Sequence, residues 1–141
     1  VTKQGVSAIV TTAGNRACHI ILRGGTDGPN HDAESIARVE GHLGEAGLAP
    51  YLMVDCSHGN SCKDYRKQPK VAHDLCAQIA TGCSAIAAVM VESNLVEGNQ
   101  KLGDDPGALV YGQSVTDACI SWQATEEVLE GFAQAVRKRR G

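Results

Sequence analysis

Short apolar runs alternate with longer amphipathic segments along the chain. The apolar runs at residues 19–22, 51–54 and 85–91 show no helical period, which predicts strands. The continuous apolarity of the third run is typical of a parallel strand that is covered on both faces. Residues 33–46 repeat apolar side chains at three- and four-residue intervals, so we expect an amphipathic helix there.

The residues at the helix ends support this pattern. Asp32 is suited to cap the first helix, and Gly47 is suited to stop it. A second helix is predicted to start at Pro69, because proline fits the first helical turn, and to end at Gly82. The predicted apolar faces of the two helices consist of Ile36, Val39, Leu43 and Ala46, and of Val71, Leu75 and Ile79.

The remaining segments give weaker patterns. Residues 5–12 are apolar and predict a short helix or a packed turn, whereas residues 95–113 predict a long loop rich in Gly, Asp and Asn. Residues 114–116 predict a short strand, and Thr125 is expected to cap a last helix. The predicted buried stripe of that helix consists of Val128, Leu129, Phe132 and Val136.

Repeated strand–helix units predict an α/β fold with a parallel sheet. The connections that enter strands are short, and those that leave strands are long and carry the charged residues. This asymmetry is typical of a (β/α)8 TIM barrel, whose active site lies at the carboxyl ends of its strands. A complete barrel needs about 250 residues, and 141 are present. We therefore expect residues 1–141 to form one partial domain, about half of a barrel.

Composition limits the classes of partner that the chain is expected to bind. The chain is 43% hydrophobic and 21% charged, with a formal net charge of -3, so neither nucleic acid nor membrane is an expected partner. The basic residues 137–140 fall in the last turn of the last predicted helix, where they complement the helix dipole. The chain begins with Val1, and residues 1–3 look like the tail of a strand, so we expect a piece of a longer protein.

The cysteines predict neither disulfides nor a zinc site. None of the six belongs to a C-x-x-C pair, and several lie in apolar surroundings, where cysteine behaves as a small hydrophobic residue. We expect reduced thiols and a cytoplasmic location.

Polar side chains that could take part in catalysis or binding follow the predicted strands. Arg23, His58, Glu92 and Asp117 each stand at a strand end. One imidazole and two carboxylates suit a divalent Mn, Fe, Co or Zn ion, although each could also be a helix cap or an ordinary satisfied polar group. The arginine precedes two glycines, the first being Gly24, and this arrangement suits a bound anion because the guanidinium forks onto phosphate oxygens.

Four motifs together resemble a known family. They are HIILRGG at residues 19–25, VDCSHGN at 54–60, VMVESNLVEGNQ at 89–100 and SVTDACISW at 114–122. They resemble type I 3-deoxy-D-arabino-heptulosonate 7-phosphate (DAHP) synthases of the branch regulated by aromatic amino acids. The similarity extends over residues 1–141 and matches the C-terminal part of the family's TIM barrel.

The resemblance implies a metal-dependent condensation of phosphoenolpyruvate with erythrose 4-phosphate, the first step of the shikimate pathway. It implies that His58, Glu92 and Asp117 are three of four metal ligands. It also implies that Arg23, with Gly24, contacts the phosphate of phosphoenolpyruvate, and that His58 is catalytic as a proton relay. An aromatic amino acid effector and a homo-oligomer are expected in the parent enzyme.

The sequence departs from the family's pattern at the fourth metal ligand, and two alternatives stay open. The family's fourth ligand is a cysteine in its N-terminal half, and none of the six cysteines stands in its motif; Cys56 and Cys62, close to His58, are interpreted as incidental. The alternative enzyme is one like 3-deoxy-D-manno-octulosonate 8-phosphate synthase. A different alternative is a non-catalytic half-barrel that associates with a complementary chain or with itself.

Overall fold

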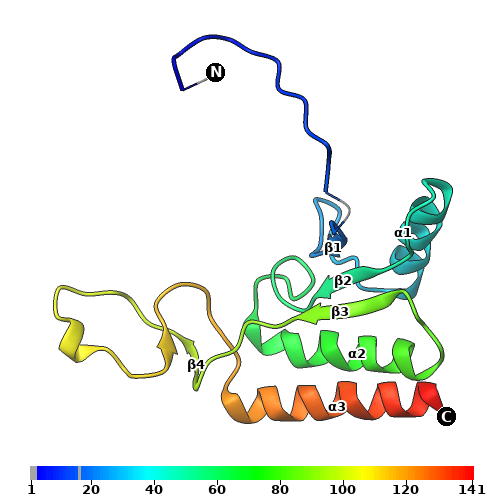
Figure 1. Ribbon diagram of the computed structural model, residues 1–141. Coiled ribbons are helices and arrows are strands. Elements are labelled where there is room, and N and C mark those ends of the chain that lie inside the picture. The colour runs from blue at the N-terminus through cyan, green and yellow to red at the C-terminus, as the bar shows by residue number, and fades with distance from the viewer. Residues whose placement is uncertain (1–2, 16) are drawn as a thin grey trace.

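The structure, a computed structural model, describes residues 3–15 and 17–141 (Figure 1). Part of the strand tail predicted at residues 1–3 therefore lies outside the described residues. The elements, in order, are β1 (Ile20–Leu22), α1 (Ala33–Glu45), β2 (Leu52–Asp55), α2 (Gln68–Ala80), β3 (Ile86–Met90), β4 (Val96–Asn99), β5 (Gln113–Ser114) and α3 (Trp122–Arg140). Two short 3-10 helices, Tyr65–Lys67 and Pro106–Ala108, lie in connections.

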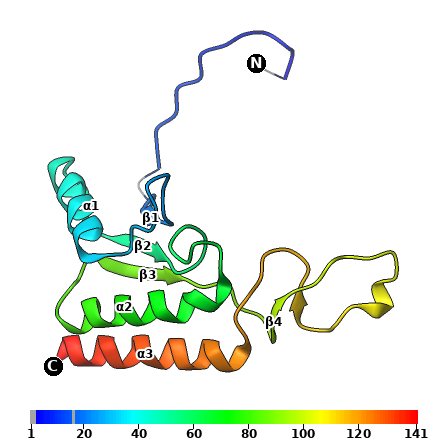
Figure 2. The same ribbon diagram turned by 180° about the vertical axis from the view of Figure 1, so that it is seen from behind.

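The first three strands form a parallel sheet in the order β1-β2-β3. Leu22 lies opposite Val54, which in turn lies opposite Val89. Helices α2 and α3 lie side by side beneath this sheet in both views (Figures 1 and 2). The alternation of parallel strands with helices confirms the predicted α/β class.

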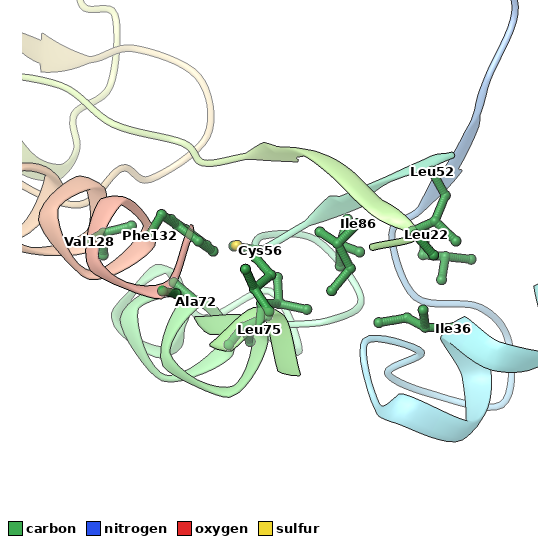
Figure 3. Packing of buried hydrophobic residues seen from close by; sticks show 14 of the residues in the cluster. Leu22, Ile36, Leu52, Cys56, Ala72, Leu75, Ile86, Val128 and Phe132 are labelled. Carbon is green, nitrogen blue, oxygen red and sulfur yellow. The ribbon is translucent and has the colours of Figure 1, made fainter. Parts of the chain in front are cut away.

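The hydrophobic core lies between this sheet and the helices (Figure 3). Leu52, Val54 and Leu75 are at most 1% exposed, and each fully buried side chain of this size stabilises the fold by about 1.5–3 kcal/mol. Ile36 joins the core from α1, and Phe132 joins it from α3. The predicted stripes of the first two helices therefore supply much of the core.

The opposite face of the sheet is uncovered within the described part of the chain. Ile21 is 47% exposed and Tyr51 is 58% exposed, and Ala87, the second residue of β3, is also exposed. Since successive side chains of a strand point to opposite faces, β3 buries only one of its faces. The prediction that residues 85–91 are covered on both faces is wrong for the described chain.

The ends of α1 follow from local chemistry. Asp32 accepts hydrogen bonds from the Ser35 N–H at 2.9 Å and from the Ser35 hydroxyl at 2.8 Å, and these bonds lower the pKa of the Asp32 carboxyl. Gly47 has a φ of 66°, which glycine adopts without steric cost. Both predicted boundaries are confirmed, but Ala46 is exposed and does not belong to the buried face.

The prediction of a helix or packed turn at residues 5–12 is wrong. Residues 6–12 have no regular structure, and Ile9 and Val10 are 99% and 79% exposed. A short isolated helix is marginal without a packed face. Apolar composition alone therefore did not produce a helix here.

The segment predicted as a loop at residues 95–113 contains β4 and extends away from the sheet (Figure 2). β5 pairs with β4 in a separate small sheet, so the strand predicted at residues 114–116 is shifted and does not join the main sheet. The Gln100 side chain fixes the segment, donating to Val110 O at 2.8 Å and accepting from Val110 N–H at 2.9 Å.

Helix α3 begins earlier than predicted. Ser121 caps it by accepting from the Ala124 N–H at 3.3 Å. The predicted cap, Thr125, lies inside the first turns, where its hydroxyl donates to Ser121 O at 2.8 Å. Leu129 is 54% exposed and does not belong to the buried stripe. Neither α3 nor any other helix in the described ranges is long and apolar enough to cross a membrane.

Candidate metal centre

The four residues predicted from strand ends line one cavity of about 390 Å3. Arg23 follows β1, His58 follows β2 and Glu92 follows β3, so the cavity lies at the carboxyl edge of the parallel sheet. Asp117 reaches the cavity from the segment after β5. One ligand atom from each of His58, Glu92 and Asp117 lies within 4.8 Å of the other two.

This spacing fits a single ion. Two ligands that are each about 2.1 Å from one zinc ion are about 3–4 Å apart. His58 Nε2 and Glu92 Oε1 are already 3.8 Å apart, and small side-chain movements would bring Asp117 to the same distance. The donor set of one imidazole and two carboxylates suits a divalent first-row metal.

His58 is held by a buried carboxylate. Its Nδ1 lies 2.8 Å from Asp55 Oδ2, and Asp55 is only 3% exposed. Because an ionised carboxylate can only accept a hydrogen bond, Nδ1 carries a proton, and in the neutral imidazole Nε2 then presents its lone pair. Such a carboxylate behind a histidine is a common partner of metal-binding imidazoles.

Glu92 is oriented in a similar way. The Ser57 hydroxyl donates to Glu92 Oε2 at 2.5 Å, and the Ser57 N–H donates to Asp55 Oδ1 at 2.7 Å. Oε2 is therefore engaged, and Oε1 is the oxygen that faces His58. Asp55 and Ser57 thus link the two candidate ligands into one network, and both are almost fully buried.

The loop after β2 is strained and tightly held. His58, Cys62 and Lys63 have φ values of 47°, 54° and 60°, and left-handed conformations of non-glycine residues often occur at functional sites. Asn60 stabilises the loop, since its amide nitrogen donates to Leu22 O at 3.1 Å and to Asp55 O at 2.8 Å.

The glycine after Arg23 has a packing role. Gly24 has a φ of 82°, and a Cβ there would lie 2.6 Å from the backbone of Gly59. Its N–H already donates to Asn30 Oδ1 at 2.7 Å. These contacts explain the glycine without an anion, and contact between Gly24 and substrate stays a prediction. Arg23 itself lines the cavity.

Sequence reasoning missed several residues of the site. Lys63 and Tyr65 line the cavity, but both stand well beyond the end of β2, outside the pattern of strand ends. Asp55 and Ser57 were within the recognised motif, but nothing in the local sequence showed which side chains they would contact.

The cysteines near the site are not part of the ligand group. All six lie in the described part of the chain and are free thiols. Cys56 is fully buried, and burial, with a smaller effect of Asp55, raises the pKa of its thiol to about 12. Cys62 is exposed. The interpretation of both as incidental fits this geometry.

Thiol labelling of the folded protein is therefore expected to separate these two cysteines. At pH 8, a pKa of about 12 leaves about one Cys56 thiolate in ten thousand, whereas exposed Cys62 reacts freely. Mass spectrometry after a short exposure to iodoacetamide should find the label on Cys62, and on Cys56 only after denaturation. Equal labelling of both under native conditions would contradict the buried position of Cys56.

Three comparisons place the chain among known proteins. The sequence profile of the DAHP synthetase I family matches residues 1–130. The chain is 54% identical over 141 residues to the Phe-sensitive phospho-2-dehydro-3-deoxyheptonate aldolase of Escherichia coli, covering 100% of this chain and 40% of that protein. It is 54% identical over 140 residues to the phospho-2-dehydro-3-deoxyheptonate aldolase of Haemophilus influenzae, covering 99% of this chain and 38% of that protein.

A solved structure gives the same result. The phospho-2-dehydro-3-deoxyheptonate aldolase of Francisella tularensis superimposes with a TM-score of 0.86 at 48% identity, covering 99% of this chain and 40% of that one. The chain thus spans about two fifths of the length of the relatives it matches.

Proposed function

The chain belongs to the DAHP synthetase I family, and from this premise we propose that it forms the metal-binding part of a phospho-2-dehydro-3-deoxyheptonate aldolase. The proposed reaction joins phosphoenolpyruvate to erythrose 4-phosphate and releases DAHP and inorganic phosphate. Residues 1–141 would be the C-terminal strand–helix units of a TIM barrel. The observation that carries this proposal is the meeting of His58, Glu92 and Asp117 at the carboxyl edge of a parallel sheet.

The side chains of the centre have distinct tasks in this proposal. His58 Nε2, Glu92 Oε1 and a carboxylate oxygen of Asp117 would hold a divalent Mn, Fe, Co or Zn ion. When bound, such an ion supplies Lewis-acid polarisation of the substrate aldehyde. Asp55 holds His58 in the tautomer that leaves Nε2 free, and Ser57 turns Glu92 Oε1 toward the imidazole.

The two roles predicted for His58 compete. As a ligand it uses Nε2, while its Nδ1 proton is held by the buried carboxylate of Asp55. Neither ring nitrogen then remains to relay a proton. We therefore propose His58 as a ligand and leave the proton relay to another group.

Two cations face the space beside the acidic centre. Arg23 and Lys63 both line the cavity, and within the described residues neither side chain has an ion pair. A guanidinium binds a phosphate through two parallel hydrogen bonds, and an ammonium adds a point charge. We assign Arg23 to the phosphate of phosphoenolpyruvate, with Lys63 as a second cation.

The proposal includes a parent enzyme that supplies the other ligand and the other substrate contacts. The uncovered sheet face, with Ile21 and Tyr51 about half exposed, is suited to packing against the remaining strands of a barrel. The same observation favours the alternative of a half-barrel that associates with a complementary chain or a second copy. Regulation by an aromatic amino acid, a homo-oligomer and a cytoplasmic location are part of the proposal.

A product assay tests the function. The protein encoded by the complete open reading frame that contains this sequence should consume phosphoenolpyruvate only when erythrose 4-phosphate and a divalent metal are present, and should release phosphate in equal amounts. Arabinose 5-phosphate, the longer sugar used by octulosonate 8-phosphate synthases, should support less than about a hundredth of that kcat/KM, a difference of about 2.7 kcal/mol. Preference for arabinose 5-phosphate would favour the alternative enzyme, and no turnover of either sugar would overturn the proposal.

A further inference from the structure

A buried glutamine lies behind the candidate metal centre. Gln68 is the first residue of α2 and is 0% exposed. A primary amide without access to water is costly unless both its donor and its acceptor are paired. The donor and the acceptor of the Gln68 amide must therefore find their partners within the protein.

Both ends of this amide bind the main chain of one residue. Gln68 Oε1 accepts from the Glu92 N–H at 2.8 Å, and Gln68 Nε2 donates to Glu92 O at 3.1 Å. Glu92 lies two residues beyond the end of β3 at Met90, where the ladder to β2 has ended. The amide thus replaces a strand partner at the position where a candidate ligand leaves the sheet.

The two contacts complete the fixation of Glu92. Glu92 O also accepts from Ile120 N–H at 3.0 Å, but the Glu92 N–H has Gln68 as its partner. Ser57 holds one side-chain oxygen, and Gln68 holds the main chain. Together these bonds leave Oε1 in place, 3.8 Å from His58 Nε2.

We propose that Gln68 is a positioning residue for Glu92 and thereby sets the affinity and geometry of the metal site. This inference rests on the proposed function, because it takes Glu92 as a ligand. Asparagine is one methylene shorter and cannot reach both Glu92 groups from the same backbone position. Methionine has a similar volume but offers neither hydrogen bond.

The test compares two glutamines of the same helix. Gln78 donates one hydrogen bond to His31 O at 2.9 Å and is not among the residues that line the centre. The Gln68→Met, Gln68→Asn and Gln78→Met variants are made in the product of the complete open reading frame, stripped of metal and titrated with Co2+. The Co2+ dissociation constant and its visible absorption spectrum are measured, together with Tm.

Gln68→Met is expected to weaken Co2+ binding about 10- to 100-fold and to change the visible spectrum. Gln78→Met is expected to lower Tm without changing either Co2+ property. Gln68→Asn keeps a neutral amide but reaches at most one of the two Glu92 main-chain groups, so its loss should be smaller yet measurable. This second Gln68 variant serves as the test if Gln68→Met does not fold.

Two failures can be told apart. If the parent protein binds Co2+ and Glu92→Gln weakens that binding, but both Gln68 variants keep the parent's affinity and spectrum, the inference about Gln68 is wrong and the proposed centre stands. If Glu92→Gln itself leaves Co2+ binding unchanged, Glu92 is not a metal ligand. The proposed metal centre and the inference about Gln68 are then both wrong.

Discussion

Replacement of Glu92 by glutamine is expected to lower kcat by more than about a hundredfold and to weaken metal binding, because the neutral amide is a poor ligand for a divalent ion. His58→Ala and Asp117→Asn should have effects of the same kind. Each change removes or neutralises one of the three ligand groups whose atoms lie within 4.8 Å of one another. The loss should exceed that caused by Gln68→Met, which leaves all three ligands in place.

The measurements are metal content after dialysis and phosphoenolpyruvate consumption by the product of the complete open reading frame. Glu97→Gln is the matched control, since it makes the same chemical change at an exposed carboxylate in β4. The control should keep parental metal content and turnover. Parental values in all three ligand variants would show that the cluster is an ordinary group of acidic side chains.

Arg23→Lys is expected to raise KM for phosphoenolpyruvate about 10- to 100-fold while changing KM for erythrose 4-phosphate much less. Lysine keeps the positive charge but loses the two parallel hydrogen bonds of the guanidinium, and a hydrogen bond to a charged group contributes about 1.5–3 kcal/mol. The nearby ammonium of Lys63 would not restore this geometry, because it acts as a point charge.

Steady-state kinetics with each substrate varied in turn distinguish the two effects. Arg137→Lys serves as the control, because Arg137 is an exposed residue of α3 paired with Glu130 at 3.1 Å, away from the cavity. Its kinetics should equal those of the parent. A larger rise in KM for erythrose 4-phosphate than for phosphoenolpyruvate would place Arg23 on the other substrate.

Local chemistry explains why parts of the fold were predictable from sequence. Asp32 caps α1 through a residue only three positions away, so its signal lies in a short window. His58 and Glu92 stand where apolar runs turn polar, and strand ends of a parallel sheet meet at one edge. The class of fold and two candidate ligands follow from these short-range patterns.

Long-range contacts explain the errors. Ser121 and Thr125 are both good caps, and the structure uses Ser121 while the Thr125 hydroxyl contacts Ser93, which is 32 positions away. No local pattern reveals such a contact. The same holds for the bonds from Gln68 to Glu92, which join residues 24 positions apart.

Asp117 was selected as a candidate ligand from a predicted strand that was placed in the wrong sheet. It was expected to end a strand of the main sheet, but β5 pairs with β4 in the small sheet. Beyond β5, Ile120 forms an isolated parallel bridge to Ser93, three residues after the end of β3. A strand of two residues carries too little periodicity to be placed from sequence, so Asp117 lies beside His58 and Glu92 although its element was misplaced, and its role as a ligand stays a prediction.

The central claim is that His58, Glu92 and Asp117 hold one divalent ion. Crystals of the complete protein with zinc, measured on both sides of the zinc absorption edge, test it directly. We expect an anomalous peak about 2.0–2.2 Å from His58 Nε2 and from one carboxylate oxygen each of Glu92 and Asp117. A fully occupied zinc ion bound elsewhere, with no peak among these three side chains, would contradict the account.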